Sequence, residues 1–188
     1  MPPAASDAGE PGTGIRVLIS ASDISGRVRE IGEEICLDYP DPSRSLLMLG
    51  VLRGGAIFLA DLARAVTRSV ELDFVQFASY HNSTQTTGSV EIVKDVTSDV
   101  YGKDVLVVED ILDTGETLTR SGLLGKLEQM GAASVRVCVL LDKPSRRRHE
   151  VAVHYRGFTI EDLFVVGYGL DLAQKYRNLP FIGVLNSA

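Results

Sequence analysis

The chain has 188 residues, of which 45% are hydrophobic and 23% charged, a composition typical of one globular domain with a buried core. Its two cysteines, Cys36 and Cys138, are too few for a disulfide framework, so we expect reduced thiols. No secretory leader pattern opens the chain, and no apolar run reaches the roughly 18 residues of a membrane span. We therefore expect a cytoplasmic protein without a membrane partner. The net charge of −6 argues against a nucleic-acid partner, because nucleic-acid binders normally carry a basic face.

The chain opens on a stretch rich in proline, glycine, alanine and acidic residues. We expect residues 1–14 to form a disordered tail and residues 15–188 to form a single domain. Residues 15–20 predict the first strand. Ser22 and Asp23 then offer N-cap chemistry for a helix with apolar residues at helical spacing, and the following Tyr-Pro-Asp-Pro stretch ends it.

The next segments alternate between strand and helix patterns. Residues 45–52 are apolar without polar alternation, which is typical of a strand covered on both faces in a parallel sheet. A helix follows to about Val66. Residues 70–80 alternate between apolar residues such as Leu72 and polar ones, and predict another strand. Residues 79–89 are polar throughout, as in loops that close over a binding site.

The second half of the chain continues this alternation. Residues 104–110 form the strongest predicted strand, and one helix, with Met130 on its apolar face, follows until Gly131. Residues 134–144 predict another strand, and residues 164–171 a short strand that enters a loop. Alternating strands and helices predict the α/β class, with a mostly parallel, twisted sheet flanked by helices.

Acidic residues follow the strongest strand at the point where a ligand would bind. In open α/β sheets, ligands lie outside the carboxyl ends of the strands. Glu109 and Asp110 end this strand, and Asp113 precedes the sequence Thr-Gly-Glu-Thr. Adjacent carboxylates repel each other, unless they hold vicinal hydroxyls or face a cation. The hydrophobic core does not need such a pair, so we predict a binding site here.

The segment after these acids has the chemistry of a phosphate site. Backbone N–H groups from Asp113 to Thr117, with the Thr114 hydroxyl, form a cup at a helix start, where unpaired donors and the helix dipole favour phosphate. Gly115 allows the backbone to approach closely. The same residues could simply cap the helix. A sugar beside a phosphate would satisfy both the acids and the cup.

The run Glu-Asp-x-x-Asp-Thr-Gly-x-Thr, after its apolar strand, resembles the phosphoribosyl-pyrophosphate (PRPP) motif of type I phosphoribosyltransferases. Residues 51–55 (VLRGG), 79–84 (SYHNST), 141–144 (LDKP) and 164–185 resemble, in the same order, the hypoxanthine-guanine phosphoribosyltransferases of bacteria. The resemblance implies a type I phosphoribosyltransferase fold with a small hood, formed by N- and C-terminal segments, and a flexible hairpin lid. It also implies a homodimer or homotetramer.

The implied reaction transfers the 5-phosphoribosyl group from PRPP to a 6-oxopurine, hypoxanthine or guanine, giving IMP or GMP and pyrophosphate, with Mg²⁺ as cofactor. Glu109 and Asp110 match residues that hold the ribose hydroxyls, and Asp113 matches the acid/base carboxylate that accepts the proton from purine N7. Lys143 matches the donor to the 6-oxo oxygen, which would discriminate against adenine. The resemblance assigns the 5-phosphate to Asp113, Thr114, Gly115, Glu116 and Thr117; pyrophosphate to Arg53, Gly54 and Arg177; the purine to Lys143, Phe164, Val165 and Asp171; the metal to Glu109, Asp110 and Asp171; and the lid to Ser79 and Tyr80.

Some positions depart from the family pattern. Arg53 stands where a lysine is common on the pyrophosphate loop, and the resemblance implies a cis peptide between Leu52 and Arg53. We expect the Glu116 side chain to point to solvent. Residues 161–163 differ from many relatives, which leaves the preference between hypoxanthine and guanine open. Residues 146–148 are three arginines, most simply a solvated run of charge, with a subunit contact as the alternative.

Other functions remain as alternatives. A phosphoribosyltransferase for another base, such as xanthine or a pyrimidine, would share the PRPP motif. A PRPP-sensing regulator that binds RNA or DNA should show a basic face, which the acidic net charge disfavours. A dinucleotide-dependent oxidoreductase is disfavoured because no GxGxxG sequence follows a predicted strand.

Overall fold

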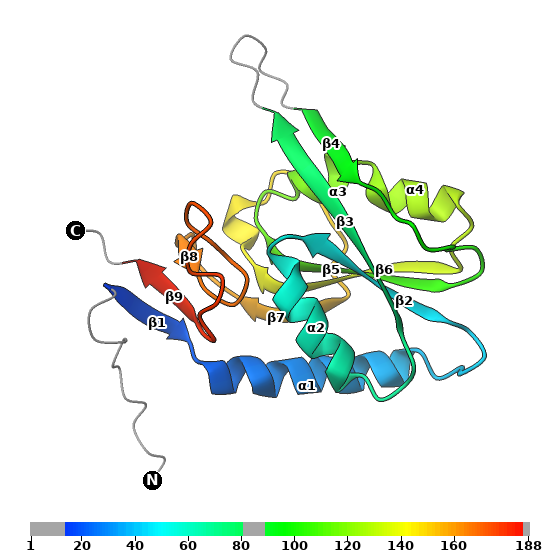
Figure 1. Ribbon diagram of the computed structural model, residues 1–188, viewed down its shortest axis with the longest axis horizontal. Helices are drawn as coiled ribbons and strands as arrows, with labels where there is room; N and C mark the ends of the chain where they lie inside the picture. Colours follow the sequence, from blue (N-terminus) through cyan, green and yellow to red (C-terminus); the bar gives the residue numbers. More distant parts are fainter. Residues whose placement is uncertain (1–13, 81–88, 186–188) are drawn as a thin grey trace.

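The structure, a computed structural model of the chain, describes residues 14–80 and 89–185. Its main layer is a six-stranded sheet (Figure 1). The strands are β2 (Leu46–Leu52), β3 (Glu71–Tyr80), β4 (Ser89–Lys94), β5 (Asp104–Leu112), β6 (Ser134–Asp142) and β7 (Tyr155–Thr159). They lie in the order β4-β3-β2-β5-β6-β7, and only the β3–β4 pair is antiparallel. The mostly parallel sheet is therefore confirmed.

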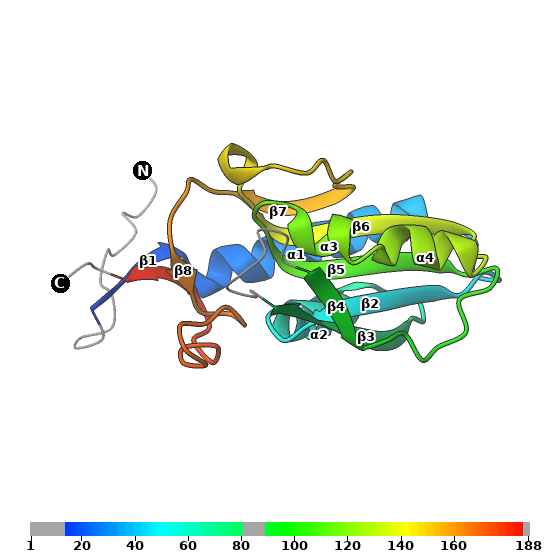
Figure 2. The same cartoon turned by 90° about the horizontal axis from the view of Figure 1, so that it is seen from above.

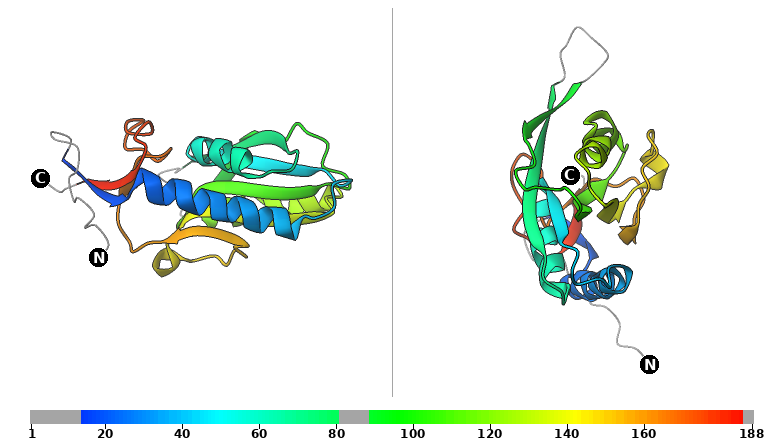
Figure 3. Two further views of the ribbon diagram at one scale, coloured as in Figure 1. Left: turned by 90° about the horizontal axis from the view of Figure 1, so that it is seen from below. Right: turned by 90° about the vertical axis from the view of Figure 1, so that its right-hand side faces the viewer.

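Helices cover both faces of this sheet. They are α1 (Ala21–Asp38), α2 (Gly55–Ala65), α3 (Glu116–Arg120) and α4 (Leu123–Gln129). Successive strand residues point to opposite faces, so Leu46 joins the apolar cluster under α1 and α2, whereas Leu47 joins the cluster under α3 and α4. Both leucines are fully buried, which explains the apolar run without alternation. Figure 3 shows α1 running beside the sheet for much of its length.

A second, three-stranded sheet forms the hood at one end of the molecule (Figure 2). It consists of β1 (Ile15–Ile19), β9 (Ile182–Leu185) and β8 (Val165–Val166), in that order. Both neighbouring pairs are antiparallel, and Ile15 lies opposite Leu185. The hood made of N- and C-terminal segments is thus confirmed. Residues 1–13 of the expected tail and residues 81–88 of the expected lid lie outside the described residues.

Two helix boundaries differ from the prediction. The Ser20 hydroxyl, and not a side chain of Ser22 or Asp23, caps α1 by accepting a hydrogen bond from the backbone N–H of Asp23 at 3.1 Å. Ser20, Ser22 and Asp23 all have side chains that can cap a helix. Because β1 ends at Ile19, the helix can begin directly after Ser20, which therefore takes the cap position. The single helix expected before Gly131 is two helices, because Gly122 adopts a left-handed φ of 66° that breaks the helical path.

One strand was missed. β7 was missed because it is short and carries Arg156 between its apolar residues. The strand expected over residues 70–80 is confirmed as β3, although its apolar alternation does not mark a buried face: Leu72 is 48% exposed, whereas Asp73 and Val75 are buried. Met130, expected on an apolar helix face, lies exposed just after α4.

Within the described ranges, no helix is long and apolar enough to cross a membrane.

Asp73 is buried because it joins β3 to the segment that follows β4. Its carboxylate accepts backbone N–H groups of Phe74, Thr97 and Ser98 at 2.7–2.8 Å, and the Lys94 ammonium at 3.0 Å. Burial alone would raise the pKa of Asp73, but these donors outweigh burial and hold the pKa well below its ordinary value.

We predict that Asp73→Asn lowers the free energy of unfolding at pH 7 by about 1–3 kcal/mol, because it removes a charged acceptor shared by five donors, the Thr97 hydroxyl among them. A depressed pKa in the folded state stabilises the fold above the unfolded pKa, and this contribution is lost as the pH falls toward the folded pKa. The difference in the free energy of unfolding between parent and variant should therefore become smaller below about pH 4. Urea unfolding from pH 7 to pH 3 measures it, with exposed Glu33→Gln as control; a gap independent of pH would contradict the assignment.

Candidate active site

The carboxyl ends of β2, β5 and β6 meet at one edge of the sheet. These strands are parallel, and their register places Gly50 beside Val108 and Leu112 beside Asp142. The segments that leave these strands therefore start side by side. They carry the predicted pyrophosphate loop after β2, the acidic motif at the end of β5, and Lys143 after β6.

Glu109 and Asp110 lie at this edge with few partners. Glu109 is 7% exposed, and among the described residues its buried Oε2 has no hydrogen-bond partner. Burial, and secondly the neighbouring carboxylate of Asp110, raise the pKa of Glu109 well above its ordinary value. Burial raises the pKa of Asp110 to about 6, and the charge of Asp171 adds to this rise. Backbone N–H groups, among them that of Ile111 at 3.0 Å, and the charge of Arg177 oppose it. Both acids are short of the donors or cations that would stabilise their charge.

The predicted pyrophosphate loop packs directly against these acids. The Leu52–Arg53 peptide is cis, as expected. A Cβ atom on Gly54 would lie 1.6 Å from Asp110 Oδ2, and a Cβ atom on Gly169 would lie 2.1 Å from the Gly54 carbonyl oxygen. Only glycine fits these two contacts, because any side chain would collide with a carboxylate or with backbone. The loop after β2 is therefore held between the end of β5 and the loop after β8.

A cavity of about 170 Å³ lies over the predicted phosphate cup, lined by Glu109 and by residues 111–115 and 117. Gly115 adopts a left-handed φ of 79°, and a Cβ atom there would lie 2.3 Å from the His149 carbonyl oxygen. Glu116, the first residue of α3, pairs with Arg120 at 3.0 Å and is half exposed. Its side chain thus turns toward the helix surface, in line with the expected solvent orientation.

The predicted purine contacts lie on the β6 and β8 sides. Lys143 is buried; its ammonium donates to the Leu163 carbonyl oxygen at 2.6 Å and retains two further donors. Phe164, the residue after Leu163, is 58% exposed, as stacking on a base would require. Val165 is buried in the hood, paired with Val184 of β9.

The loop after β8 brings Asp171 and Arg177 together and adds a residue that sequence reasoning missed. Asp171 forms an ion pair with the Arg177 guanidinium at 2.7 Å and accepts a hydrogen bond from the backbone N–H of Gln174 at 2.8 Å. The Gln174 side-chain oxygen accepts from Arg53 at 3.2 Å and from Arg177 at 3.3 Å. A polar loop residue gives no sequence signal for such a bridge. Gln174 thus connects the two arginines assigned to pyrophosphate.

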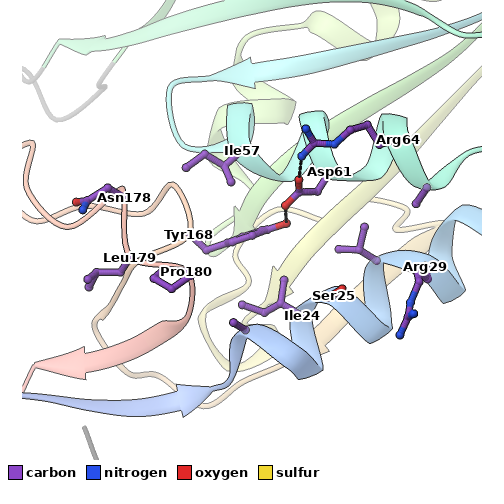
Figure 4. A pocket seen from close by; sticks show the side chains of 13 residues that line it. Ile24, Ser25, Arg29, Ile57, Asp61, Arg64, Tyr168, Asn178, Leu179 and Pro180 are labelled. Carbon is purple, nitrogen blue, oxygen red and sulfur yellow. Dashed lines mark hydrogen bonds and ion pairs between the residues drawn. The ribbon is translucent and has the colours of Figure 1, made fainter. Parts of the chain in front are cut away.

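The same loop has an unusual backbone and an anchor on α2. Non-glycine residues rarely have positive φ, and such residues cluster at functional sites; here they are Tyr168, Ala173, Gln174 and Tyr176. The Tyr168 hydroxyl donates to Asp61 of α2 at 2.6 Å, and Asp61 also pairs with Arg64. Figure 4 shows this chain of contacts beside a cavity of about 530 Å³ between α1, α2 and residues 178–180. That cavity is not lined by the acids at the end of β5.

The three acids predicted to bind metal do not form a complete metal site. The described part of the chain has no group of three or more His, Cys, Asp or Glu side chains placed to hold a metal ion. The donors nevertheless suit Mg²⁺, because Glu109 has an unpartnered carboxylate oxygen and Asp110 feels the charge of Asp171. Mg²⁺ commonly uses one or two carboxylates and completes its shell with water and substrate phosphates.

The three arginines at 146–148 are not simply a solvated run. Arg147 has a side chain only 12% exposed; it pairs with Asp142 and donates to the carbonyl oxygens of Leu112 and Asp113. Arg146 donates to the Asp113 carboxylate at 3.2 Å. Of the three, Arg148 alone has an exposed side chain without an assigned partner in the described chain. The prediction of a solvated run was wrong because three arginines in a row do not show that the connection after β6 folds back against the end of β5. There two of the arginines contact Asp113 and Asp142.

Two predicted lid residues can be placed only in part. Ser79 and Tyr80 end β3, where the backbone pairs with Val90 and Ser89 of β4. Their side chains lie outside what the structure describes, so their role remains a prediction.

A family model described as "Phosphoribosyl transferase domain" matches residues 22–173. The chain belongs to the phosphoribosyltransferase family. It is 46% identical over 169 residues to the hypoxanthine phosphoribosyltransferase of Escherichia coli K12, covering 90% of this chain and 94% of the relative. It is 44% identical over 173 residues to the hypoxanthine-guanine phosphoribosyltransferase of Bacillus subtilis 168, covering 92% and 94%.

Solved structures agree with this family assignment. A hypoxanthine phosphoribosyltransferase from Staphylococcus aureus matches with a TM-score of 0.82 and 41% identity over 90% of each chain. A hypoxanthine-guanine phosphoribosyltransferase from Bacillus anthracis has the same TM-score and identity over 89% of this chain and 96% of that one. The parallel sheet with its hood is thus the type I phosphoribosyltransferase fold, as the resemblance implied.

The raised pKa of Asp110 predicts that this acid destabilises the ligand-free fold. Because the folded pKa of about 6 exceeds the ordinary value of 3.8, the folded state carries an unfavourable charge above pH 6, whereas below about pH 4 both states are protonated. Asp110→Asn should therefore increase the free energy of unfolding at pH 7.5 by about 1–3 kcal/mol, and by almost nothing at pH 4. Urea unfolding without metal or substrate measures this. Exposed Glu128→Gln is the matched control, and a destabilised Asp110→Asn at pH 7.5 would refute the prediction.

Proposed function

We propose that this chain acts in purine salvage as a hypoxanthine-guanine phosphoribosyltransferase, transferring the 5-phosphoribosyl group from PRPP to hypoxanthine or guanine. The observation that carries the proposal is the adjacent pair of buried Glu109 and partly buried Asp110, with a cavity of about 170 Å³ on one side and the buried ammonium of Lys143 after the neighbouring strand. Its relatives of 44–46% identity carry the names of the same activity.

In the proposed reaction, purine N9 forms a bond to ribose C1 as the bond from C1 to the pyrophosphate oxygen breaks. The proton on purine N7 passes to the carboxylate of Asp113. Glu109 and Asp110 hold the ribose hydroxyls, and residues 113–117 hold the 5-phosphate through backbone N–H groups and hydroxyls. This arrangement would fix the ribose while its C1 moves between the two partners.

Negative charge develops on the leaving pyrophosphate, and fixed positive charges can stabilise it there. Arg53, Gly54 and Arg177 are proposed to take this role. The contacts of Gln174 with both arginines, and the close approach of Gly54 to Asp110, support the proposal. Mg²⁺, held by Glu109, Asp110 and Asp171 together with substrate oxygens, would supply further neutralisation of the phosphates. Ser79 and Tyr80 are proposed to belong to the lid that excludes water.

On the purine side, Lys143 would donate to the 6-oxo oxygen while Phe164 stacks on the ring. Val165 would contact the ring edge through its backbone, and Asp171 would lie near the same edge. The Leu163 carbonyl oxygen already orients the Lys143 ammonium in the free protein. We also propose, from the family resemblance, that the active form is a homodimer or homotetramer, which light scattering can measure.

The proposed function is tested by offering hypoxanthine, guanine, xanthine and adenine separately, with PRPP and Mg²⁺, and following nucleotide and pyrophosphate. We expect IMP and GMP to form and AMP formation to be slower by at least about a hundredfold, because a site built to donate to an oxo group meets only donors on the adenine amino group. Turnover of xanthine alone would indicate the sister activity. Tight PRPP binding without turnover of any base would contradict an enzymatic role.

Lys143→Gln should reduce the preference for hypoxanthine over adenine by about tenfold or more, since a glutamine amide can accept as well as donate. The measurement is the ratio of kcat/KM values for the two bases. Lys126→Gln, on α4 and paired with Asp95, removes the same charge away from the site and should leave the ratio unchanged. An unchanged ratio in Lys143→Gln would place the 6-oxo contact on another group.

A further inference from the structure

Arg146 joins two acids that come from different segments of the chain. It closes the short 3₁₀ turn Pro144–Arg146 that follows Lys143. Its Nε donates to Asp113 Oδ1 at 3.2 Å, and its Nη1 donates to Asp162 Oδ2 at 3.4 Å. Asp113 is the proposed proton acceptor, and Asp162 lies two residues before the proposed stacking ring of Phe164. One guanidinium therefore touches both the PRPP loop and the purine side.

The backbone beneath Arg146 is held in place independently. The side chain of Arg147 contacts Asp142 and the carbonyl oxygens of Leu112 and Asp113. The backbone N–H groups of Arg148 and His149 both donate to the Thr114 carbonyl oxygen at 3.0 Å. Because these contacts involve other residues, the connection should keep its path when only the Arg146 side chain changes.

The contact with Arg146 makes the two oxygens of the Asp113 carboxylate different. Oδ1 accepts from Arg146, whereas Oδ2 has no assigned partner within the described residues. A guanidinium that donates to one carboxylate oxygen restricts how that carboxylate can turn. The oxygen that remains free to accept a proton is therefore restricted in direction as well.

We propose that Arg146 is a positioning residue for the transfer reaction: it binds Asp113 Oδ1 and so presents Oδ2 to purine N7. Its second contact, with Asp162, links this orientation to the segment that carries the base platform. The inference rests on the proposed function and refines it. Both ion pairs of Arg146 are about half exposed, and such pairs contribute little to stability. The role should accordingly appear in turnover and not in the stability of the fold.

The first test compares Arg146→Gln, Arg146→Lys and the control Arg148→Gln, which removes the same charge from an exposed side chain two residues away. We expect kcat with hypoxanthine to fall about tenfold in Arg146→Gln, while the dissociation constant for PRPP and the Tm stay near those of the parent. Arg146→Lys should recover part of kcat, since an ammonium can still reach one carboxylate. Arg148→Gln should match the parent.

The second test asks whether Arg146 acts through Asp113. Asp113→Asn removes the proton acceptor, so adding Arg146→Gln to it should cause no further loss of kcat, a non-additive cycle. Three results would overturn the inference: losses of kcat that add fully in the double variant, an equal loss of kcat in Arg148→Gln, or a loss of PRPP affinity with kcat unchanged. An unchanged kcat in Arg146→Gln would do the same. An inactive parent would instead refute the proposed function, so the two failures are distinguishable.

Discussion

The burial of two adjacent carboxylates at the end of β5 is the constraint on which the site depends. Side-by-side acids in a partly dry environment are unfavourable for folding, and burial raises the pKa of both Glu109 and Asp110. Hydroxyls and cations relieve the same cost when they bind. Under the proposed function, the free energy that destabilises the ligand-free site would become affinity for a polyhydroxylated, cation-bearing substrate, as is common where function and stability compete.

The surroundings of this pair are arranged to keep it accessible and fixed. Gly54 leaves the loop after β2 close enough to touch Asp110, and Gly169 brings the following loop onto Gly54. Tyr168 then ties that loop to Asp61 on α2. The loop after β2, the acids at the end of β5 and the loop after β8 are thus connected through direct contacts. Because these contacts are close, a movement of one segment would displace the others.

The sequence predicted the fold and much of this site because those signals are local. An apolar run that ends in Glu109 and Asp110 can be recognised without knowing its neighbours, and so can the turn around Gly115. The cap at Ser20 and the break at Gly122 were missed because several nearby residues could serve equally well. Gln174 and Arg146 were missed for another reason: their partners are distant in the chain, and the register of β5, β6 and the C-terminal loop brings them together.

The hood has its own consequence for how the chain is organised. Because Ile15 pairs with Leu185, the two ends of the described chain lie side by side, held by the hydrogen bonds between β1 and β9. The entropy cost of closing a loop grows only slowly with its length, but these hydrogen bonds can form only after the intervening sheet has brought the two strands into reach. The hood should thus be among the last elements to assemble. A short linker that joins the start of β1 to the end of β9 would allow the chain to be opened in an exposed connection elsewhere. The product would be a circular permutant with the same arrangement of strands and helices.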